Sequence, residues 1–237
     1  MTAGLQVFND DNIIQIDDEY SNLRFISKGS FVAENGLNSI TVSNAHLPIL
    51  ALRVTSTSED RGYAAQEAVR ASGSTWVFDL RVGIEFLNNQ VTVEYWIFDK
   101  GDPSPSGFGL QTFSSNGGLV FDSNEKYFKC VENIKVNNWT TETWQGVKSY
   151  ETGHTYAAVS GQFGGQWRGT AIPPNPPQPG IYRQNNDGPA VFATTVPGAV
   201  RVGIGTVFSM QQTGATGPVG TVIFPALSMM ILDVTDI

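Results

Sequence analysis

A segment near the start of the chain recurs 105 residues later, and this repeat constrains the fold more than any other feature of the sequence. Gly4–Phe8 (GLQVF) returns as Gly109–Phe113 (GLQTF), and the correspondence continues without a gap to Ile26 and Val131. Most apolar positions stay apolar between the two copies, and Asp17 falls on Asp122. Self-similarity at a fixed spacing indicates that one structural unit is used twice.

Each copy has the pattern of a β-hairpin. In the first copy, apolar residues alternate in Leu5–Phe8 and again in Ile14–Ile16. Alternation with a period of two is typical of strands. Between them, Asn9–Asn12 supplies Asn and Asp residues, which tolerate the positive φ that a hairpin turn needs. We therefore predict an all-β protein of two related β-sandwich-like halves that start with similar hairpins, Gly4–Ile26 and Gly109–Val131. The sequence leaves open whether the halves merge into one unit.

A linker-like segment marks the boundary between the halves. Lys100–Gly107 is rich in Pro, Gly and Ser, so we predict one β domain over residues 1–102 and a second over residues 103–237. Only 15% of the 237 residues are charged, whereas Gly and Pro number 25 and 12, which favours strands joined by many turns. Further strands are predicted at Ser39–Val42, Ile49–Val54, Trp76–Val82, Val91–Phe98, Tyr156–Ser160, Val191–Thr194, Ala199–Ile204, Thr221–Phe224 and Met229–Val234.

Three stretches between these strands favour other conformations. Glu59–Ala71 is rich in Ala, Glu and Gln and is the one candidate helix, with a loop as the alternative because it contains Gly62 and lacks a clear apolar face. Asn88-Asn89 predicts a turn between the strands that precede and follow it. Ile172–Pro179 predicts an extended polyproline-like loop, since Pro cannot donate to a sheet.

The charge pattern excludes several classes of partner. Fourteen basic and 22 acidic residues give a net charge of −8 without any basic stripe, which argues against nucleic-acid binding and attraction to an anionic membrane. No stretch is long and apolar enough to predict membrane insertion, and the first residues lack the pattern of a signal peptide, so we expect synthesis in a cytosol. Cys130 is the single cysteine, so an internal disulfide and CxxC sites are excluded.

No constellation of residues predicts catalysis. His46 and His154 are the two histidines, and their turn-like surroundings suggest solvated loop side chains. The acidic clusters Asp10-Asp11 and Asp17–Glu19 contain the residue type that a glycosidase uses in pairs, but Asp is also favoured in turns for its own backbone hydrogen bonds. Calcium-loop spacing is absent from both clusters. We predict no catalytic residue, no cofactor and no metal site.

Aromatic residues give the one signal for binding. Five of them crowd a region of the second half among Gly, Thr, Asn and Gln. Exposed aromatics with polar neighbours suit contacts to sugars or proteins, whereas buried ones would fill the core of a sandwich. The sequence leaves both alternatives open for the group. As candidates for surface recognition we take Trp139, Trp144 and Trp167, with Tyr150 and Tyr156 nearby.

Several of these segments together suggest a family. The N-terminal Gly4–Asn9 leads into a turn, Val93–Asp99 precedes the linker, and Gly109–Ser123 continues to Lys126–Lys129. This order, with the closing strands Phe224–Leu227 and Ile231–Val234, resembles minor tail, tail-tip or tail-fibre-associated virion proteins of tailed bacteriophages. The motifs are those of hairpins, so the resemblance implies an architecture and a setting more than a mechanism.

The resemblance implies a non-enzymatic structural component of a phage tail tip or baseplate. Such a protein would be made in the bacterial cytoplasm, incorporated into the virion and assembled with other tail proteins such as hub and fibre. We expect it to be a homo-oligomer, with a trimer favoured. The alternative is a receptor-binding module that recognises a glycan or protein of the host surface. A glycan hydrolase, suggested only by the acidic clusters, is a third hypothesis.

Overall fold

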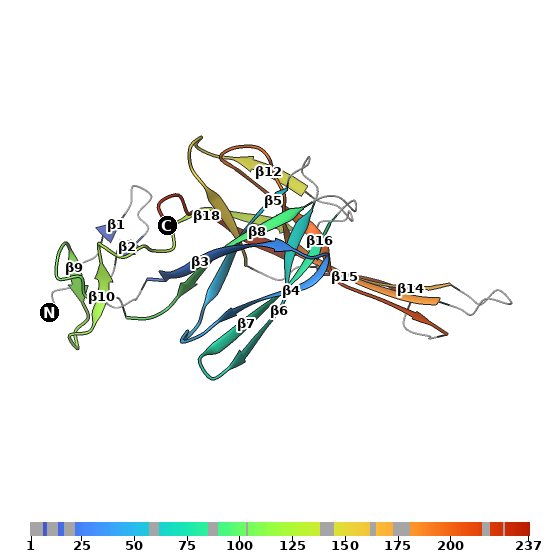
Figure 1. The fold of residues 1–237 in the computed structure, drawn as a ribbon, viewed down its shortest axis with the longest axis horizontal. Helices are drawn as coiled ribbons and strands as arrows, with labels where there is room; N and C mark the ends of the chain where they lie inside the picture. The colour runs from blue at the N-terminus through green and yellow to red at the C-terminus, as the bar shows by residue number, and fades with distance from the viewer. Residues whose placement is uncertain are drawn as a thin grey trace.

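The structure is a computed structural model, and every element that it describes is a β-strand. Two large antiparallel sheets pack face to face, and two small hairpins project from one end of this sandwich, as Figure 1 shows. The all-β sandwich-like fold predicted from the sequence is therefore confirmed. The described residues are 7–8, 14–16, 22–56, 62–84, 90–102, 104–137, 145–161, 165–172, 181–214, 219–224 and 226–237.

The first large sheet has six strands in the order β11-β18-β13-β5-β8-β3. Three of them come from the first half of the chain and three from the second. All neighbouring pairs in it are antiparallel. The strands are β3 (Arg24–Ala33), β5 (Ile49–Ser56), β8 (Val91–Asp99), β11 (Cys130–Asn137), β13 (Tyr156–Ser160) and β18 (Ala226–Asp233).

The second large sheet has eight strands, six of them in the order β12-β16-β15-β6-β7-β4. The other two, β14 and β17, pair with each other, and β14 also pairs with β15. Together with the outer parts of β15 and β16 they form an arm that extends away from the sandwich (Figure 1). The strands are β4 (Gly36–Val42), β6 (Tyr63–Ser72), β7 (Thr75–Gly83), β12 (Gln145–Ser149), β14 (Gly165–Ile172), β15 (Ile181–Phe192), β16 (Ala199–Thr213) and β17 (Gly220–Phe224).

The two halves of the chain meet inside both sheets. In the six-stranded sheet β5 pairs with β13, and Ala51 lies opposite Val159. In the eight-stranded sheet β6 pairs with β15, and Ala64 lies opposite Val191. Counted outward from this junction, the six-stranded sheet runs β5-β8-β3 in the first half and β13-β18-β11 in the second. The eight-stranded sheet runs β6-β7-β4 and β15-β16-β12 in the same way. The halves thus form one merged sandwich, an alternative that the sequence left open.

The hairpin repeat is reproduced residue by residue. The first hairpin consists of β1 (Val7–Phe8) and β2 (Ile14–Ile16), and the second of β9 (Gln111–Phe113) and β10 (Leu119–Asp122). Both contain a register shift, and their cross-strand partners correspond at the spacing of the repeat. The paired residues are Val7–Ile16 and Phe8–Ile14 in the first hairpin, and Thr112–Phe121 and Phe113–Leu119 in the second.

The structural repeat continues into the strands that follow the hairpins. β3 has an irregularity between Phe25 and Ser27 where it pairs with β8, and β11 has one between Cys130 and Glu132 where it pairs with β18. Bulges are position-specific features of a sheet, so their coincidence extends the likeness beyond the hairpins. The relation between the halves therefore covers sheet pairing as well as local sequence.

The main core fills the space between the sheets. Alternate residues of β5 and β7 contribute to it, among them Val54 and Leu80, and so do Val202 and Ile231 from the second half. Their side chains are almost completely buried, with at most 1% of their surface exposed. Because apolar burial is the dominant favourable term in folding, this shared core holds the two halves together.

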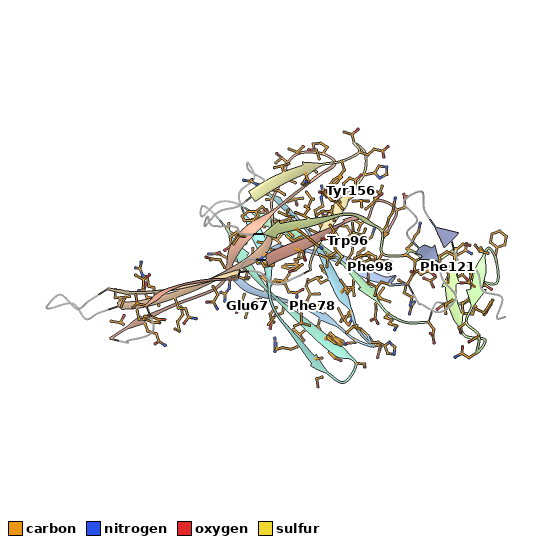
Figure 2. All side chains as sticks on the ribbon, turned by 180° about the vertical axis from the view of Figure 1, so that it is seen from behind. Glu67, Phe78, Trp96, Phe98, Phe121 and Tyr156 are labelled. Atoms are coloured by element: carbon orange, nitrogen blue, oxygen red, sulfur yellow. The ribbon has the colours of Figure 1, made fainter. Side chains whose placement is uncertain are left out.

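A second apolar cluster lies on the outer face of the six-stranded sheet. Trp96 and Phe98 project from β8 into it, and both are labelled in Figure 2. The segments that lead out of the two hairpins cover this face, with the backbone N–H of Phe128 donating to the carbonyl oxygen of Leu23 at 2.8 Å. The Phe128 and Phe25 rings contact Phe98 edge-on, with ring centroids 5.3 and 6.1 Å apart. The hairpins are thereby anchored to the sandwich.

The structure corrects the prediction for Glu59–Ala71. Within the described part of that range the chain forms β6, a strand, instead of a helix or loop. β6 lies between β7 and β15, where the small side chains of Ala64 and Ala65 are at most 1% exposed. The pairing on both edges outweighs the high helix propensity of Ala, because tertiary context commonly overrides intrinsic propensity. All nine further strands predicted from the sequence overlap observed strands, whereas Asn88-Asn89 and residues 173–179 lie outside the described residues.

Candidate functional site

Of the three tryptophans predicted to recognise a surface, the structure describes the backbone of one, Trp167. Trp139 and Trp144 lie outside the described residues. Trp167 belongs to β14, where its backbone lies between Asn186 of β15 and Val222 of β17 in the arm. Their role in recognition stays a prediction.

The two tyrosines of the same region belong to the core side of the sandwich. Tyr156 is 4% exposed in the main core, and Tyr150 packs against it with ring centroids 4.7 Å apart. The Tyr150 hydroxyl donates to Glu132 at 2.6 Å, and Lys148 forms an ion pair with the same carboxylate at 2.8 Å. Lys148 and then Tyr150 lower the pKa of Glu132, while burial and the Glu132 contact raise the pKa of Tyr150. These contacts fasten edge strand β11 of one sheet to β12 of the other.

His154 is part of a polar cluster around the buried carboxylate of Asp233, which the sequence did not suggest. Its Nδ1 lies 3.1 Å from Oδ2 of Asp233, the last residue of β18, and only 32% of its side chain is exposed. Lys129 donates to the same oxygen at 2.7 Å, and the Thr235 hydroxyl donates to Oδ1 at 2.6 Å. Burial alone would raise the pKa of Asp233, but Lys129, Thr235 and His154 together hold it well below its usual range.

The first half has a matching His–Asp contact. Asp99 ends β8 as Asp233 ends β18, and Nδ1 of His46 lies 3.8 Å from its Oδ2. The backbone N–H groups of His46 and Leu47 donate to Asp99 at 2.8 and 2.7 Å. The His46 side chain is 81% exposed, so the interpretation as a solvated side chain is confirmed for His46 and wrong for His154. The sequence does contain a sign of this likeness, because β8 ends in Ile97–Asp99 (IFD) and β18 ends in Ile231–Asp233 (ILD).

These His–Asp clusters have a structural character. Each aspartate receives donors from the loop that enters the neighbouring strand or from the turn that follows its own strand. Among the described residues, neither imidazole forms a hydrogen bond to a Ser, Thr or Cys side chain that could act as a nucleophile. The described residues also contain no group of three His, Cys, Asp or Glu side chains arranged to hold a metal ion. The acidic clusters Asp10-Asp11 and Asp17–Glu19 lie outside the described part.

The second hairpin is built around one buried carboxylate, Asp122, which is completely buried. The backbone N–H groups of Ser106 and Asn124 donate to it at 2.9 and 2.8 Å, and Gln111 Nε2 donates at 2.7 Å. These donors, in that order, hold the pKa of Asp122 far below its usual range. Asn124 also donates to the carbonyl oxygen of Phe108. The loop before β9 is therefore fixed to the turn after β10.

Three large apolar side chains are exposed on this rigid hairpin. Phe108 is 80% exposed, Leu110 49% and Phe113 52%. Exposed apolar side chains are common singly, but three of them within six positions of the chain make this element a candidate for an interaction surface. We call Phe108, Leu110 and Phe113 the hairpin patch. The hairpin patch is the candidate site that the geometry supports best.

The arm at the other end of the molecule has a different chemistry. Its described side chains include the amides Gln184, Asn186, Gln211 and Gln212, and Arg183 donates to Gln211 at 2.8 Å. Amides offer both donors and acceptors, which suits polar ligands such as sugars. Sequence reasoning found Trp167 here but not the amides, which are scattered over two strands that only the fold brings together.

Comparison with protein-family models, curated proteins and solved structures found no match. Within the described residues, no helix is long and apolar enough to cross a membrane.

Proposed function

We propose that this chain is a structural component of a bacteriophage tail tip or baseplate. The observation that carries the proposal is the placement of the hairpins and the arm, which project from opposite ends of one sandwich (Figure 1). A component that links neighbours in an assembly needs separate contact surfaces held at a fixed distance. The core shared by both halves supplies that rigidity, because it leaves no flexible joint between them.

The sequence supports the same setting. The hairpin segments that resemble phage tail proteins carry the exposed hairpin patch, and the resemblance extends to two stretches of the sandwich, Val93–Asp99 and Ile231–Val234. The patch is apolar and rigid, as the anchors of protein interfaces are. In this proposal the hairpin end attaches to tail proteins such as the hub or fibre, and the arm faces outward.

The test is to locate the chain in purified particles. Phage particles from a lysate of the producing cells are analysed by mass spectrometry and by immunogold electron microscopy with antibody against the recombinant protein. The proposal expects the chain in washed particles and gold label at the distal end of the tail. Intact particles that lack the chain, with the protein free in the lysate, would overturn it. Particles treated with pre-immune antibody give the control.

A receptor-binding module is the second candidate, and the arm favours it. Trp167 and the amides of β15 and β16 belong to this projection, and aromatic and amide residues are the types that suit the recognition of a surface glycan. Purified protein is titrated onto host cells, and Trp167→Ala is compared with Val32→Ser, an exposed residue of β3 far from the arm in sequence. Saturable binding weakened only by Trp167→Ala supports the module. Absence of saturable binding excludes it.

A further inference from the structure

Each half of the chain has a basic residue at the same place, but only one of the two is neutralised within the chain. The spacing of the repeat sets Arg24 over Lys129. Lys129 forms an ion pair with Asp233 at 2.7 Å. Asp99, the counterpart of Asp233, lies opposite Arg24 in the sheet, but its carboxylate accepts two backbone N–H groups from the loop before β5 instead. The positive charge of Arg24 therefore has no partner equivalent to Asp233.

The guanidinium of Arg24 holds donors without an acceptor. Its Nε is buried and has no hydrogen-bond partner. Of the groups that the structure describes, none forms a hydrogen bond or ion pair with the rest of this guanidinium. A buried donor without an acceptor is unfavourable, and in a native protein such a group points to an ion or water molecule that completes it.

The unpaired edge of the guanidinium faces Gly101. A Cβ added to Gly101 would lie 3.6 Å from both Nε and Nη2 of Arg24, and 4.0 Å from Nδ1 of His46. Nε and Nη2 form one edge of the guanidinium, and two parallel N–H groups of this kind can bind both oxygens of a carboxylate. Gly101 does not have a positive φ, so the backbone does not require glycine here. The missing side chain leaves space beside three nitrogen atoms.

His46 brings a second polar group to the same place. Its side chain is 81% exposed, so a ligand can reach it, and its Nδ1 is 3.8 Å from Asp99, too far for a hydrogen bond. The loop that carries it is fixed. Asn44 has a φ of +58°, a left-handed conformation that Asn tolerates, and Trp76 Nε1 donates to the carbonyl oxygen of Ala45 at 3.1 Å. The imidazole is therefore held on a positioned loop beside Gly101.

We propose that Arg24 and His46 bind the carboxylate of a small acidic ligand beside Gly101, and we call these three residues the Gly101 site. The surrounding charges favour a single negative charge on the ligand. Lys100 and Asp102 flank Gly101, are both exposed and offset each other. Arg24 is thus the one cation to be neutralised, and a doubly charged phosphate would add an excess negative charge. A carboxylate of this kind belongs to a simple organic acid or to an acidic sugar.

The experiment follows the imidazole signals of the full-length protein by nuclear magnetic resonance. The chain has two histidines, and His154, which contacts Asp233, is the internal reference for His46. The protein is titrated with sodium acetate, sodium glucuronate, sodium phosphate and neutral glucose at constant pH and ionic strength. We expect a saturable shift of the His46 signal with both carboxylates, no shift with glucose, and an unchanged His154 signal. Tighter binding of glucuronate identifies an acidic sugar, and equal binding a simple carboxylate.

Variants connect this signal to the Gly101 site. Arg24→Gln should raise the dissociation constant about tenfold or more, because it removes the charged donor. Gly101→Ala retains both side chains and should also weaken binding, since the new methyl group fills the space beside them at ordinary contact distances. Lys135→Gln, which removes an exposed lysine of β11, is the matched control and should bind like the wild type. Thermal melting verifies that each variant is folded.

Three results would overturn the assignment. One is a His46 signal that does not shift saturably with either carboxylate. Another is binding that Arg24→Gln and Lys135→Gln weaken equally, which would indicate a general effect of charge. The third is phosphate that binds more tightly than acetate. All readouts use purified protein, so they are separate from the test for the chain in phage particles.

Discussion

Ala51 and Val159 lie directly opposite each other where the two halves join, at equivalent places in β5 and β13. Ala51 of β5 pairs with Trp96 of β8, and Val159 of β13 pairs with Met230 of β18. Trp96 and Met230 lie equally many residues before Asp99 and Asp233, the aspartates that end their strands. Equivalent strands that pair antiparallel in this way are related by a local two-fold axis. The chain is therefore built like a dimer whose two subunits have been joined.

Ala51→Leu tests the junction between the halves. Ala51 is completely buried against Trp96 and Val159 on the outer face of the six-stranded sheet. Extra volume in a packed site costs typically about 1–3 kcal/mol, and we expect the free energy of unfolding to fall by that amount. Because both halves share one core, urea unfolding should remain a single transition by fluorescence and circular dichroism.

Val131→Leu on β11 is the control for this junction. Val131 is 42% exposed, so the added methylene has room and the free energy of unfolding should change by less than about 0.5 kcal/mol. Two separate unfolding transitions in the wild-type protein would contradict a merged sandwich.

Asp122→Ala tests whether one carboxylate orders the second hairpin. The substitution removes the acceptor for Ser106, Gln111 and Asn124 and leaves their donors unpaired. We expect faster amide hydrogen exchange over residues 104–125 with little change in the sandwich core, because the hairpin contributes no residue to that core. Ser115→Ala, in the exposed turn of the same hairpin, should leave the exchange rates unaltered.

The repeat predicted much of this fold, but the assembly of the halves needed the structure. Short runs of apolar residues located β7, β8 and β13, each of which lies between two neighbouring strands and is buried at several consecutive positions. The sequence pattern failed for β6, because its Ala, Gln and Glu residues are not typical of strands, although Ala64 pairs with Val191 of β15. The pairing of His154 with Asp233 was missed as well, since 79 residues separate them in the chain and only the similar ends of β8 and β18 indicate it in the sequence.

Acid should destabilise the protein through Asp233. Its pKa is lowered in the folded state, so its contribution to stability is fully present above the ordinary carboxyl pKa of about 4 and is lost as the pH falls further toward the folded value. Asp233→Asn should lower the free energy of unfolding at pH 7. It should also remove part of the fall in that free energy that the wild-type protein shows as the pH drops below about 5. Denaturant titrations at several pH values measure this. An unchanged pH profile in Asp233→Asn would place the acid-sensitive groups elsewhere.

Gly198 and Gly214 form a matched pair for the last prediction, because both have positive φ, +67° and +73°, but different surroundings. A Cβ on Gly214 would meet nothing within 4 Å, so Gly214→Ala should cost only the left-handed backbone, about 1 kcal/mol. A Cβ on Gly198 would lie 2.7 Å from the carbonyl oxygen of Glu151, a backbone atom that cannot rotate away. The Gly198 carbonyl oxygen also accepts the N–H of Tyr150 at 2.9 Å, so this loop would have to move as a whole. We expect Gly198→Ala to lower the free energy of unfolding at least twice as much as Gly214→Ala in urea titrations, and equal losses would show that backbone strain alone acts at both positions.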